Sequence, residues 1–183
     1  MDDGQPGTDG ERRARFDAVA AEVVEPVRRF LARRTDPDTA GDVLADTLLV
    51  CWRRLDDVPD QPVPWAYGVA RNALANAERG ARRQRRLAAR IAAVDPPGEE
   101  TPVDPEPDPR VAAALAALRP EDADLLRLWA WEQLGPAEIA TVMGVTPNAV
   151  SIRLHRAREK FKDALRKMED PVGHEDMREG SGP

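Results

Sequence analysis

The sequence predicts an all-α fold of two small helical domains joined by a flexible, acidic, proline-rich linker. Hydrophobic residues make up 42% of the 183 residues, whereas aromatic residues make up only 4%. Most of the apolar residues are Ala and Leu, which favour helices, and the β-branched runs that favour sheets are short. Along most of the chain, apolar residues recur at spacings of three and four, as in amphipathic helices.

The N-terminal domain is expected over residues 11–92. It follows a Gly- and Asp-rich N-terminus, residues 1–10, which is predicted to be disordered because it has too few apolar residues to pack. The first helical pattern starts at Glu11. Pro26 is expected to break or kink this helix, because proline removes a backbone hydrogen bond and clashes with the preceding turn.

A further helix is expected over residues 38–55, with Asp36 as its cap and Pro37 in its first turn. Its apolar stripe consists of Ala40, Val43, Leu44, Thr47, Leu48, Cys51 and Leu55. The loop DDVPDQPVP (56–64) follows, because its three closely spaced prolines exclude a helix. Pro64 is expected to open the next helix, which is apolar at first and rich in arginine later.

The linker is expected over residues 93–109, where prolines and acidic residues alternate and no apolar stripe can form. The C-terminal domain is expected over residues 110–169. It begins with a short helix that ends before Pro120, and a second helix, predicted to reach residue 134, starts there. A polar tail over residues 170–183 is predicted to be disordered.

The stretch GPAEIATVMGVTPNAVSIRLHRAREKF (135–161) has the pattern of a helix-turn-helix. Ala140 supplies the small residue where the two helices touch, Gly144 can take the positive φ of the turn, and Thr146 can cap the second helix. The expected buried residues are Ile139 and Val142 on the first helix and Val150, Leu154, Ala157 and Phe161 on the second.

The other face of the second helix is polar and basic, and we call it the recognition face; it carries Asn148, Ser151, Ile152, His155, Arg156 and Arg158. Asn can hydrogen-bond adenine and an exposed Ile can contact a thymine methyl group. Arg156, Arg158, Lys160 and Lys162 are better placed for phosphates. The alternative is a packed helical hairpin with a solvated basic face.

A second basic segment combines aromatic rings, asparagines and arginines. Its candidate nucleic-acid contacts are Trp65, Tyr67, Arg71, Asn72, Asn76, Arg79, Arg82 and Arg83. Aromatic rings can stack on unpaired bases while arginines hold phosphates, which suits single-stranded nucleic acid. The alternative is that Trp65 is a core residue and the arginines are a solvated face.

The charge distribution fits two confined anion-binding surfaces. The formal net charge is −6, but residues 71–90 carry +6 and residues 153–167 carry +5. A single cysteine, Cys51, excludes an internal disulfide and a Cys-based zinc site, and the pattern contains no catalytic constellation. We therefore expect no enzyme activity, no metal and no cofactor. Neither a signal peptide nor a membrane-spanning segment is predicted, which indicates a cytoplasmic protein.

The order of these motifs resembles an extracytoplasmic-function (ECF) sigma factor of the sigma-70 family of RNA polymerase sigma factors. AGDVLADTLLVCWRRL and PWAYGVARNALANAERGARR are similar to region 2, and LRPEDADLLRLWAWEQLGPAEIATVMGVTPNAVSIRLHRAR is similar to region 4. The resemblance covers both domains and the position of the linker. Asn72, in the sequence ARN, matches a position that the family favours.

The resemblance implies a role for each surface. Asp42, Asp46, Leu49 and Arg53 are expected to bind the clamp helices of the polymerase β′ subunit. The second basic segment, through Trp65, Tyr67, Arg71, Asn72, Asn76, Arg79, Arg82 and Arg83, is expected to bind the −10 element with its non-template strand unpaired. The −35 element is expected to contact Thr146, Asn148, Ser151, Ile152, His155, Arg156 and Arg158.

The implied partners are core RNA polymerase, through its β′ clamp helices and β flap, promoter DNA, and an anti-sigma factor. No small-molecule substrate and no membrane insertion are expected. Two other hypotheses stay open at this point. One is a dimeric helix-turn-helix regulator that binds duplex DNA. The other is a helical interaction protein that does not initiate transcription.

Overall fold

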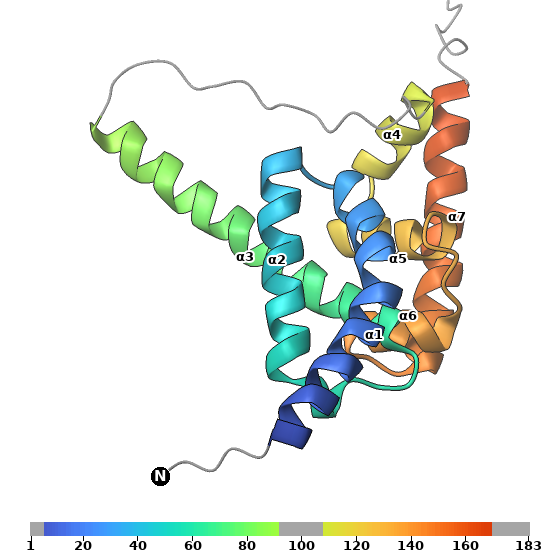
Figure 1. Ribbon diagram of the computed structural model, residues 1–183. Helices are drawn as coiled ribbons and strands as arrows, with labels where there is room; N and C mark the ends of the chain where they lie inside the picture. Colours follow the sequence, from blue (N-terminus) through green and yellow to red (C-terminus); the bar gives the residue numbers. More distant parts are fainter. Residues whose placement is uncertain (1–5, 92–107, 170–183) are drawn as a thin grey trace, which may run out of the picture.

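The computed structural model describes residues 6–91 and 108–169, and within these ranges every regular element is a helix (Figure 1). The all-α prediction is confirmed. The α-helices are α1 (Pro6–Ala32), α2 (Pro37–Arg53), α3 (Pro62–Ile91), α4 (Pro109–Ala116), α5 (Pro120–Ala130), α6 (Pro136–Met143) and α7 (Pro147–Glu169), with a 3₁₀ turn, η1, at Leu55–Asp57. None of the described helices is long and apolar enough to cross a membrane.

Helix α1 is longer than the sequence predicts. It begins at Pro6, so residues 6–10 are helical rather than part of a disordered N-terminus, and it continues through Pro26. An interior proline costs a helix about 3 kcal/mol. Here its neighbours Val23, Val27 and Phe30 are fully buried. Their packing holds the helix together where the proline lacks its hydrogen bond.

Helix α2 forms as its sequence signals predict. The Asp36 carboxylate accepts a hydrogen bond from the backbone N–H of Thr39 at 2.9 Å, and this bond lowers the pKa of Asp36. Val43, Thr47 and Cys51 are buried along the predicted stripe. The Thr47 hydroxyl donates to the carbonyl of Val43 at 2.7 Å, which explains how a polar side chain fits in the core.

Helix α3 begins at Pro62, two residues before the predicted start at Pro64. Both prolines lie in the first turn, where backbone N–H groups have no partner within the helix. The first half of α3 is buried through residues such as Ala66 and Ala70, whereas residues 81–86 are exposed. The second half therefore extends away from the other helices as an arm (Figure 1).

Helices α4, α5 and α6 all pack against α7. Helix α5 ends at Ala130, four residues before the predicted end. Trp131 caps it, Gln133 has a positive φ of 56°, and Leu134 turns back into the core with 6% of its surface exposed. Burial of Leu134 thus turns the chain toward α6 after only three turns of α5.

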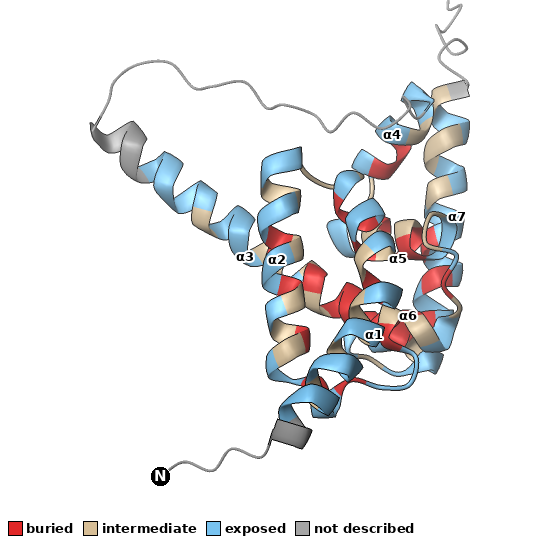
Figure 2. Ribbon diagram, in the orientation of Figure 1, coloured by how far each residue is buried: buried red, intermediate tan, exposed pale blue. Residues whose placement is uncertain are grey.

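The helices form an N-terminal group (α1–α3) and a C-terminal group (α4–α7), and the apolar core is continuous between the two groups. One cluster of buried side chains includes Phe30 of α1, Ala70 of α3, Leu125 of α5, Ile139 of α6 and Leu154 of α7. Helix α3 packs against α6 as well as against α1 and α2. In Figure 2 the buried positions, in red, lie on helices of both groups. The linker prediction over 93–109 and the tail prediction over 170–183 fall almost wholly outside the described residues.

Two glycine substitutions should change stability in opposite directions. Gly144 ends α6 with a φ of 66°, so Gly144→Ala should lower the free energy of unfolding by about 1–2 kcal/mol. Gly41 lies in α2 with open space around its Cα, so Gly41→Ala should raise it by about 0.5–1 kcal/mol. Urea unfolding followed by circular dichroism measures both. Equal effects of the two substitutions would contradict the assigned turn.

Candidate nucleic-acid interface

The turn between α6 and α7 is built by local hydrogen bonds. The Glu138 carboxylate accepts from the backbone N–H of Gly135 at 2.7 Å, which fixes the start of α6. After Gly144, the backbone N–H of Val145 donates to the carbonyl of Ala140 at 3.1 Å. The Thr146 hydroxyl then accepts from the N–H of Ala149 at 3.3 Å. The predicted glycine turn and threonine cap are confirmed.

Helix α7 buries one face and exposes the other. Val150, Leu154 and Ala157 are buried against the rest of the C-terminal helices, together with Ile139 and Val142 of α6. The predicted recognition face is exposed in full: Asn148, Ser151, Ile152, His155, Arg156 and Arg158. Ile152 has 46% of its surface exposed, which is high for a large apolar side chain. An apolar group held in solvent among polar ones is suited to contact with a thymine methyl.

Several bases of α7 that were expected to bind phosphate have partners within the protein. Lys160 donates to Asp122 of α5 at 2.6 Å, and Lys162 donates to Glu159 at 2.8 Å. The Arg158 guanidinium lies 4.7 Å from the centre of the Trp129 ring. Such exposed ion pairs contribute little stability and can exchange partners. Phosphate binding by these side chains therefore requires exchange of these contacts.

Arg153 was absent from the sequence-based set, although it is exposed on α7 between Ile152 and the buried Leu154. No ion pair is formed by Arg153 or Arg156 within the described parts of the chain. Since neither guanidinium has to leave a carboxylate, these two are the α7 arginines most readily available to an anion. Arg156 was predicted, and helical spacing could have identified Arg153 as well, but sequence alone does not report which neighbouring bases are already paired.

The two aromatic rings at the start of α3, those of Trp65 and Tyr67, differ in how far they are buried. Trp65 is partly buried, and the Arg54 guanidinium lies 5.9 Å from its ring centre. Tyr67 is only 5% exposed, and its ring packs on Phe30 with centres 5.0 Å apart. Burial raises the pKa of Tyr67. In this arrangement the Tyr67 ring belongs to the core and is not free to stack on a base, and the DNA contact expected of Tyr67 stays a prediction.

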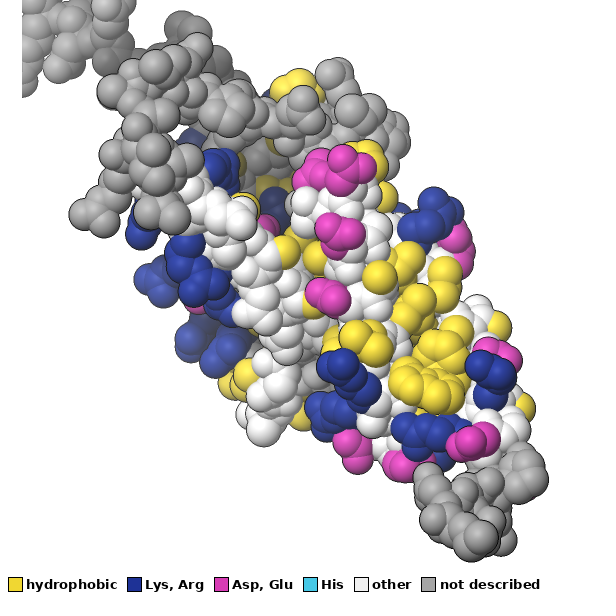
Figure 3. Space-filling view, turned by 60° about the vertical axis from the view of Figure 1, so that its left-hand side comes forward, with side chains coloured by type: hydrophobic (Ala, Val, Ile, Leu, Met, Phe, Trp, Pro, Cys, Tyr) yellow, Lys and Arg dark blue, Asp and Glu magenta, His cyan; other side chains and the backbone are white. Residues whose placement is uncertain are grey.

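The basic part of α3 is only partly free. Asn72, Asn76, Arg79, Arg82 and Arg83 are exposed, as the sequence predicts. Arg71 instead donates to Asp124 of α5 at 2.6 Å. Within the helix, Arg79 donates to Asn76 and Arg82 to Glu78. Figure 3 shows basic side chains gathered along one flank of the molecule.

The surface predicted to bind polymerase lies on α2. Asp42, Asp46, Leu49 and Arg53 are all exposed, at successive spacings of four, three and four that place them on one face. Leu49 has 43% of its surface in solvent. Figure 3 shows a row of acidic side chains beside an apolar band on this side of the molecule. A charged face with an exposed leucine suits a protein partner.

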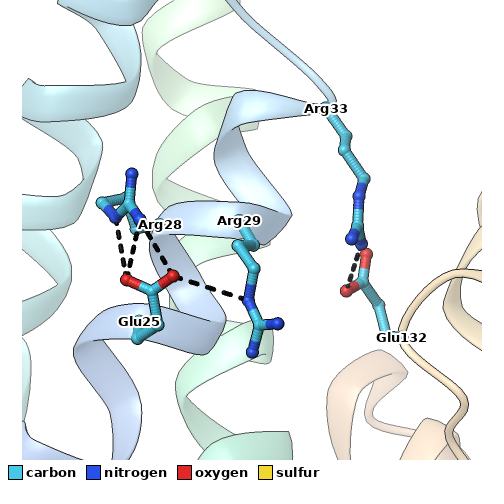
Figure 4. Close-up of polar contacts among 5 residues, drawn as sticks. All are labelled: Glu25, Arg28, Arg29, Arg33 and Glu132. Atoms are coloured by element: carbon cyan, nitrogen blue, oxygen red, sulfur yellow. Dashed lines mark hydrogen bonds and ion pairs between the residues drawn. The ribbon is translucent and has the colours of Figure 1, made fainter. Parts of the chain in front are cut away.

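A cluster of largely buried charges joins the turn after α1 to the turn after α5. Arg33 and Arg34 donate to the two carboxylate oxygens of Glu132 at 3.0 and 2.8 Å, and the Glu132 side chain is only 3% exposed. Figure 4 shows the Arg33 side chain reaching from the turn after α1 toward Glu132. The same view contains a second pair of bonds, from Arg28 to Glu25 within α1.

Arg34 is the most constrained member of this cluster. Its guanidinium lies 3.7 Å from the centre of the Phe30 ring and donates to the carbonyl of Phe30 at 2.8 Å. Its Nη2 atom is buried without a hydrogen-bond partner within the described residues. Burial lowers the pKa of Arg34, although Glu132 opposes that effect. The cost of removing two charges from water can offset their mutual attraction, so a buried pair of this kind is weak evidence of added stability.

A groove of about 810 Å³ lies between the two groups of helices. Arg71, Asn72 and Arg79 of α3 line one side of it, and Glu121 and Asp124 of α5 line the other. The residues predicted to bind the −10 element therefore face acidic side chains of the C-terminal helices. Sequence analysis assigned no role to these acids, because the contacts join residues far apart in the chain.

The structure gives no sign of a metal or thiol centre in the part of the chain that it describes. No group of three or more His, Cys, Asp and Glu side chains is arranged to hold a metal ion there. Cys51 is buried, and burial raises the pKa of its thiol. A raised thiol pKa makes a reactive thiolate less abundant.

Known proteins match this chain along most of its length. Residues 109–161 match the family model for sigma-70, region 4. The chain is 31% identical to the RNA polymerase sigma factor CnrH of Cupriavidus metallidurans, over 85% of this chain and 88% of that protein. It is 30% identical to the RNA polymerase sigma factor CarQ of Myxococcus xanthus, over 88% of this chain and 94% of that protein. It is also 29% identical to the ECF RNA polymerase sigma factor SigL of Mycobacterium tuberculosis, over 85% and 89%.

Two solved structures share the fold. One is the PhyRSL–NepR complex from Sphingomonas sp. Fr1, with a TM-score of 0.60 and 17% identity over 89% of this chain and 98% of the matched chain. The other is the sigma factor RpoE in complex with the anti-sigma factor NepR from Bartonella quintana, with a TM-score of 0.58 and 19% identity over 82% and 96%.

The chain therefore belongs to the sigma-70 family of RNA polymerase sigma factors, in its extracytoplasmic-function group. The matches cover the N-terminal helices as well as the helix-turn-helix. This coverage favours a sigma factor over a helix-turn-helix regulator, which would leave the first three helices unexplained.

Substitution of the two rings of α3 should separate a core role from a surface role. Tyr67→Ala should lower the free energy of unfolding by about 3 kcal/mol or more, because it empties space beside Phe30. Trp65→Ala should cost about half as much or less, because its ring is only partly buried. Chemical denaturation of the free protein compares them. A Tyr67→Ala protein as stable as the wild type would contradict the burial of this ring.

Proposed function

We propose that this sigma factor binds core RNA polymerase through α2 and directs it to promoters by two DNA contacts. In this proposal α3 holds the unpaired −10 strand and α7 reads the −35 element as duplex. The observation that carries the proposal is the presence of two separate exposed surfaces, one on each group of helices. The arm of α3 is basic, and the recognition face of α7 combines amide, hydroxyl, imidazole and apolar groups.

Each surface suits its proposed form of DNA. The narrow α7 helix can enter a major groove, where Asn148 and Ile152 can contact base edges. The flanking guanidiniums of Arg153 and Arg156 can bind phosphates and set the register of the helix. On α3, the exposed Asn72, together with Trp65, can bind bases that have left the stack.

Binding of the unpaired −10 strand by α3 would favour opening of the duplex. Unpairing a base costs a few kcal/mol, and a protein that binds the flipped base and exposed strand offsets that cost. Polymerase performs the chemistry of RNA synthesis, so this chain needs no catalytic residues of its own. Its place of action is then the cytoplasm, at the nucleoid when bound to polymerase.

The proposed domain boundaries follow the two groups of helices. Residues 11–92 would act as region 2 and residues 110–169 as region 4, with residues 93–109 as the linker. The exposed face of Asp42, Asp46, Leu49 and Arg53 would contact the β′ clamp helices, and the C-terminal domain would contact the β flap. An anti-sigma factor is a proposed further partner, since one matched structure is a sigma factor in complex with an anti-sigma factor.

Transcription in vitro tests the proposal as a whole. Purified core RNA polymerase should produce discrete transcripts from genomic DNA when this protein is added, and their start sites should depend on it. Sequencing of the 5′ ends would also give the two promoter elements. A protein that binds polymerase without yielding transcripts would instead be a non-initiating interaction protein. Absence of both binding and transcripts would refute the proposal.

Single substitutions should separate strand opening from duplex reading. Asn72→Ala and Arg79→Ala should each reduce open-complex formation about tenfold, equivalent to about 1.4 kcal/mol, while polymerase binding is unchanged. Permanganate footprinting measures the opening. Ile152→Ala is the matched control, because it should change the preferred −35 sequence and not the opening of a pre-melted template. Weakened opening by Ile152→Ala on that template would contradict the division of roles.

A further inference from the structure

A small apolar pocket lies where α4, α5 and α7 meet, and its apolar side chains have no part in the proposed contacts with DNA or with the clamp helices. Its volume is about 240 Å³. It shares only Arg127 and Trp131 with the groove between the two groups of helices. We call it the tryptophan pocket, after its two indole side chains. Its apolar lining consists mainly of Val111, Leu115, Leu126, Trp129, Trp131 and Phe161.

The pocket combines aliphatic core residues with aromatic rings that are open to solvent. Leu115 and Leu126 are only 7% and 6% exposed, so they belong to the core beneath it. Trp131 and Phe161 are partly buried, whereas Trp129 has 39% of its surface exposed. A ligand that covers this apolar surface gains the free energy of removing it from water. An aromatic ligand is favoured in particular, because rings attract one another in edge-to-face and offset arrangements.

The charged part of the lining is entirely basic within the described residues. Lys162 already donates to the Glu159 carboxylate at 2.8 Å. The Arg158 guanidinium instead lies over an aromatic side of the pocket, 4.7 Å from the centre of the Trp129 ring. A negatively charged ligand therefore meets a net positive charge, whereas a positively charged ligand would be repelled. The charged side chains that line the pocket are Arg127, Arg158 and Lys162.

Arg127 is the base best suited to bind an anion. Its guanidinium lies 5.5 Å from the centre of the Trp131 ring and makes no hydrogen bond or ion pair in the described parts of the chain. The nearby Asp124 carboxylate is bound by Arg71 at 2.6 Å. Burial lowers the pKa of Arg127, although the charge of Asp124 opposes that effect. Since water screens a partly buried charge less than an exposed one, a carboxylate would be attracted to Arg127 more strongly than to a solvated arginine.

The size of the pocket limits the ligand. Its volume of about 240 Å³ is smaller than the roughly 300–1,000 Å³ of sites for drug-sized molecules. One or two fused rings would therefore fill it, whereas a long acyl chain would leave most of its length in water. A carboxylate is the anion that matches a single guanidinium, because the two planar groups can form a pair of parallel hydrogen bonds.

We propose that the tryptophan pocket is a binding site for a small aromatic carboxylate. The ring of this ligand lies among Trp129, Trp131 and Phe161, and its carboxylate binds the Arg127 guanidinium. The inference goes beyond the proposed function, because binding at this site needs neither polymerase nor promoter DNA. It gives the C-terminal helices a small-molecule site in addition to the recognition face.

Titration calorimetry of the full chain with 2-naphthoate tests the site. One molecule should bind per chain, with a Kd of about 0.1 mM, as expected for a ligand of this size. Arg127→Gln should weaken this binding about tenfold, because it removes the charge that holds the carboxylate. Arg119→Gln is the matched control, since it removes the same charge from the exposed start of α5, outside the pocket. The control should bind 2-naphthoate as the wild type does.

The neutral compound 2-naphthylmethanol separates the contribution of charge from that of apolar contact. It should bind the wild type about tenfold more weakly than 2-naphthoate, and it should bind Arg127→Gln and the wild type equally. Equal affinity of the wild type for the two compounds would indicate an apolar surface of the kind that a protein partner covers. That result would overturn the carboxylate site.

Trp129→Ala keeps the test valid if Arg127→Gln fails to fold. Because Trp129 is exposed, its replacement should preserve a cooperative melting transition while weakening 2-naphthoate about tenfold. Unchanged affinity in a folded Arg127→Gln or Trp129→Ala protein, or the absence of saturable binding to the wild type, would overturn the proposal. Calorimetry uses the free protein, so a failure of transcription with core polymerase would refute the proposed function and leave this site intact.

Discussion

The close approach of α3 to α6 at Gly68 is the constraint on which the arrangement of this molecule depends. Without a side chain at that position, the backbone of Val142 can lie against α3, and one apolar core extends from α1 to α7. The same approach brings Glu132 within reach of Arg34 and Asp124 within reach of Arg71. The two ion pairs and the glycine contact therefore cross the same boundary between the N-terminal and C-terminal helices.

The acidic total charge of a DNA-binding chain also has a local explanation. Acids of α5 and the turn after it pair with bases from other parts of the chain: Asp122 with Lys160, Asp124 with Arg71, and Glu132 with Arg34. Lys160 and Arg71 belong to helices that we propose to bind DNA. In that proposal DNA has to exchange with Asp122 and Asp124, an effect that net charge alone does not describe.

Sequence reasoning succeeded where the signals are local. The Asp36 cap, the Gly144 turn and the Thr146 cap each depend on residues within three or four positions, so residue types are sufficient to predict them. The buried seam of α7 follows from helical periodicity in the same way. For the same reason, the recognition face opposite that seam was placed correctly as an exposed surface.

Sequence reasoning failed where contacts between distant parts of the chain decide the structure. Helix α1 continues through Pro26 because Val23, Val27 and Phe30 are buried against other helices. The burial of the Tyr67 ring against Phe30 was not predicted, because the two residues are far apart in the chain. The partners Arg71 and Asp124 are 53 residues apart, so no local period indicates their pairing. The role of Gly68 could not be predicted for the same reason. In the sequence, a glycine within a helix indicates only a low helix propensity, and its close contact with a facing helix is not visible.

The most direct measurement is the distance between the N-terminal helices (α1–α3) and the C-terminal helices (α4–α7) in solution. Spin labels at Ala21→Cys on α1 and Lys167→Cys on α7, both exposed sites, can be introduced after Cys51→Ser removes the native thiol. Electron–electron double resonance should give one short, narrow distance distribution, because α3 packs against α6. A broad distribution of long distances would contradict that packing.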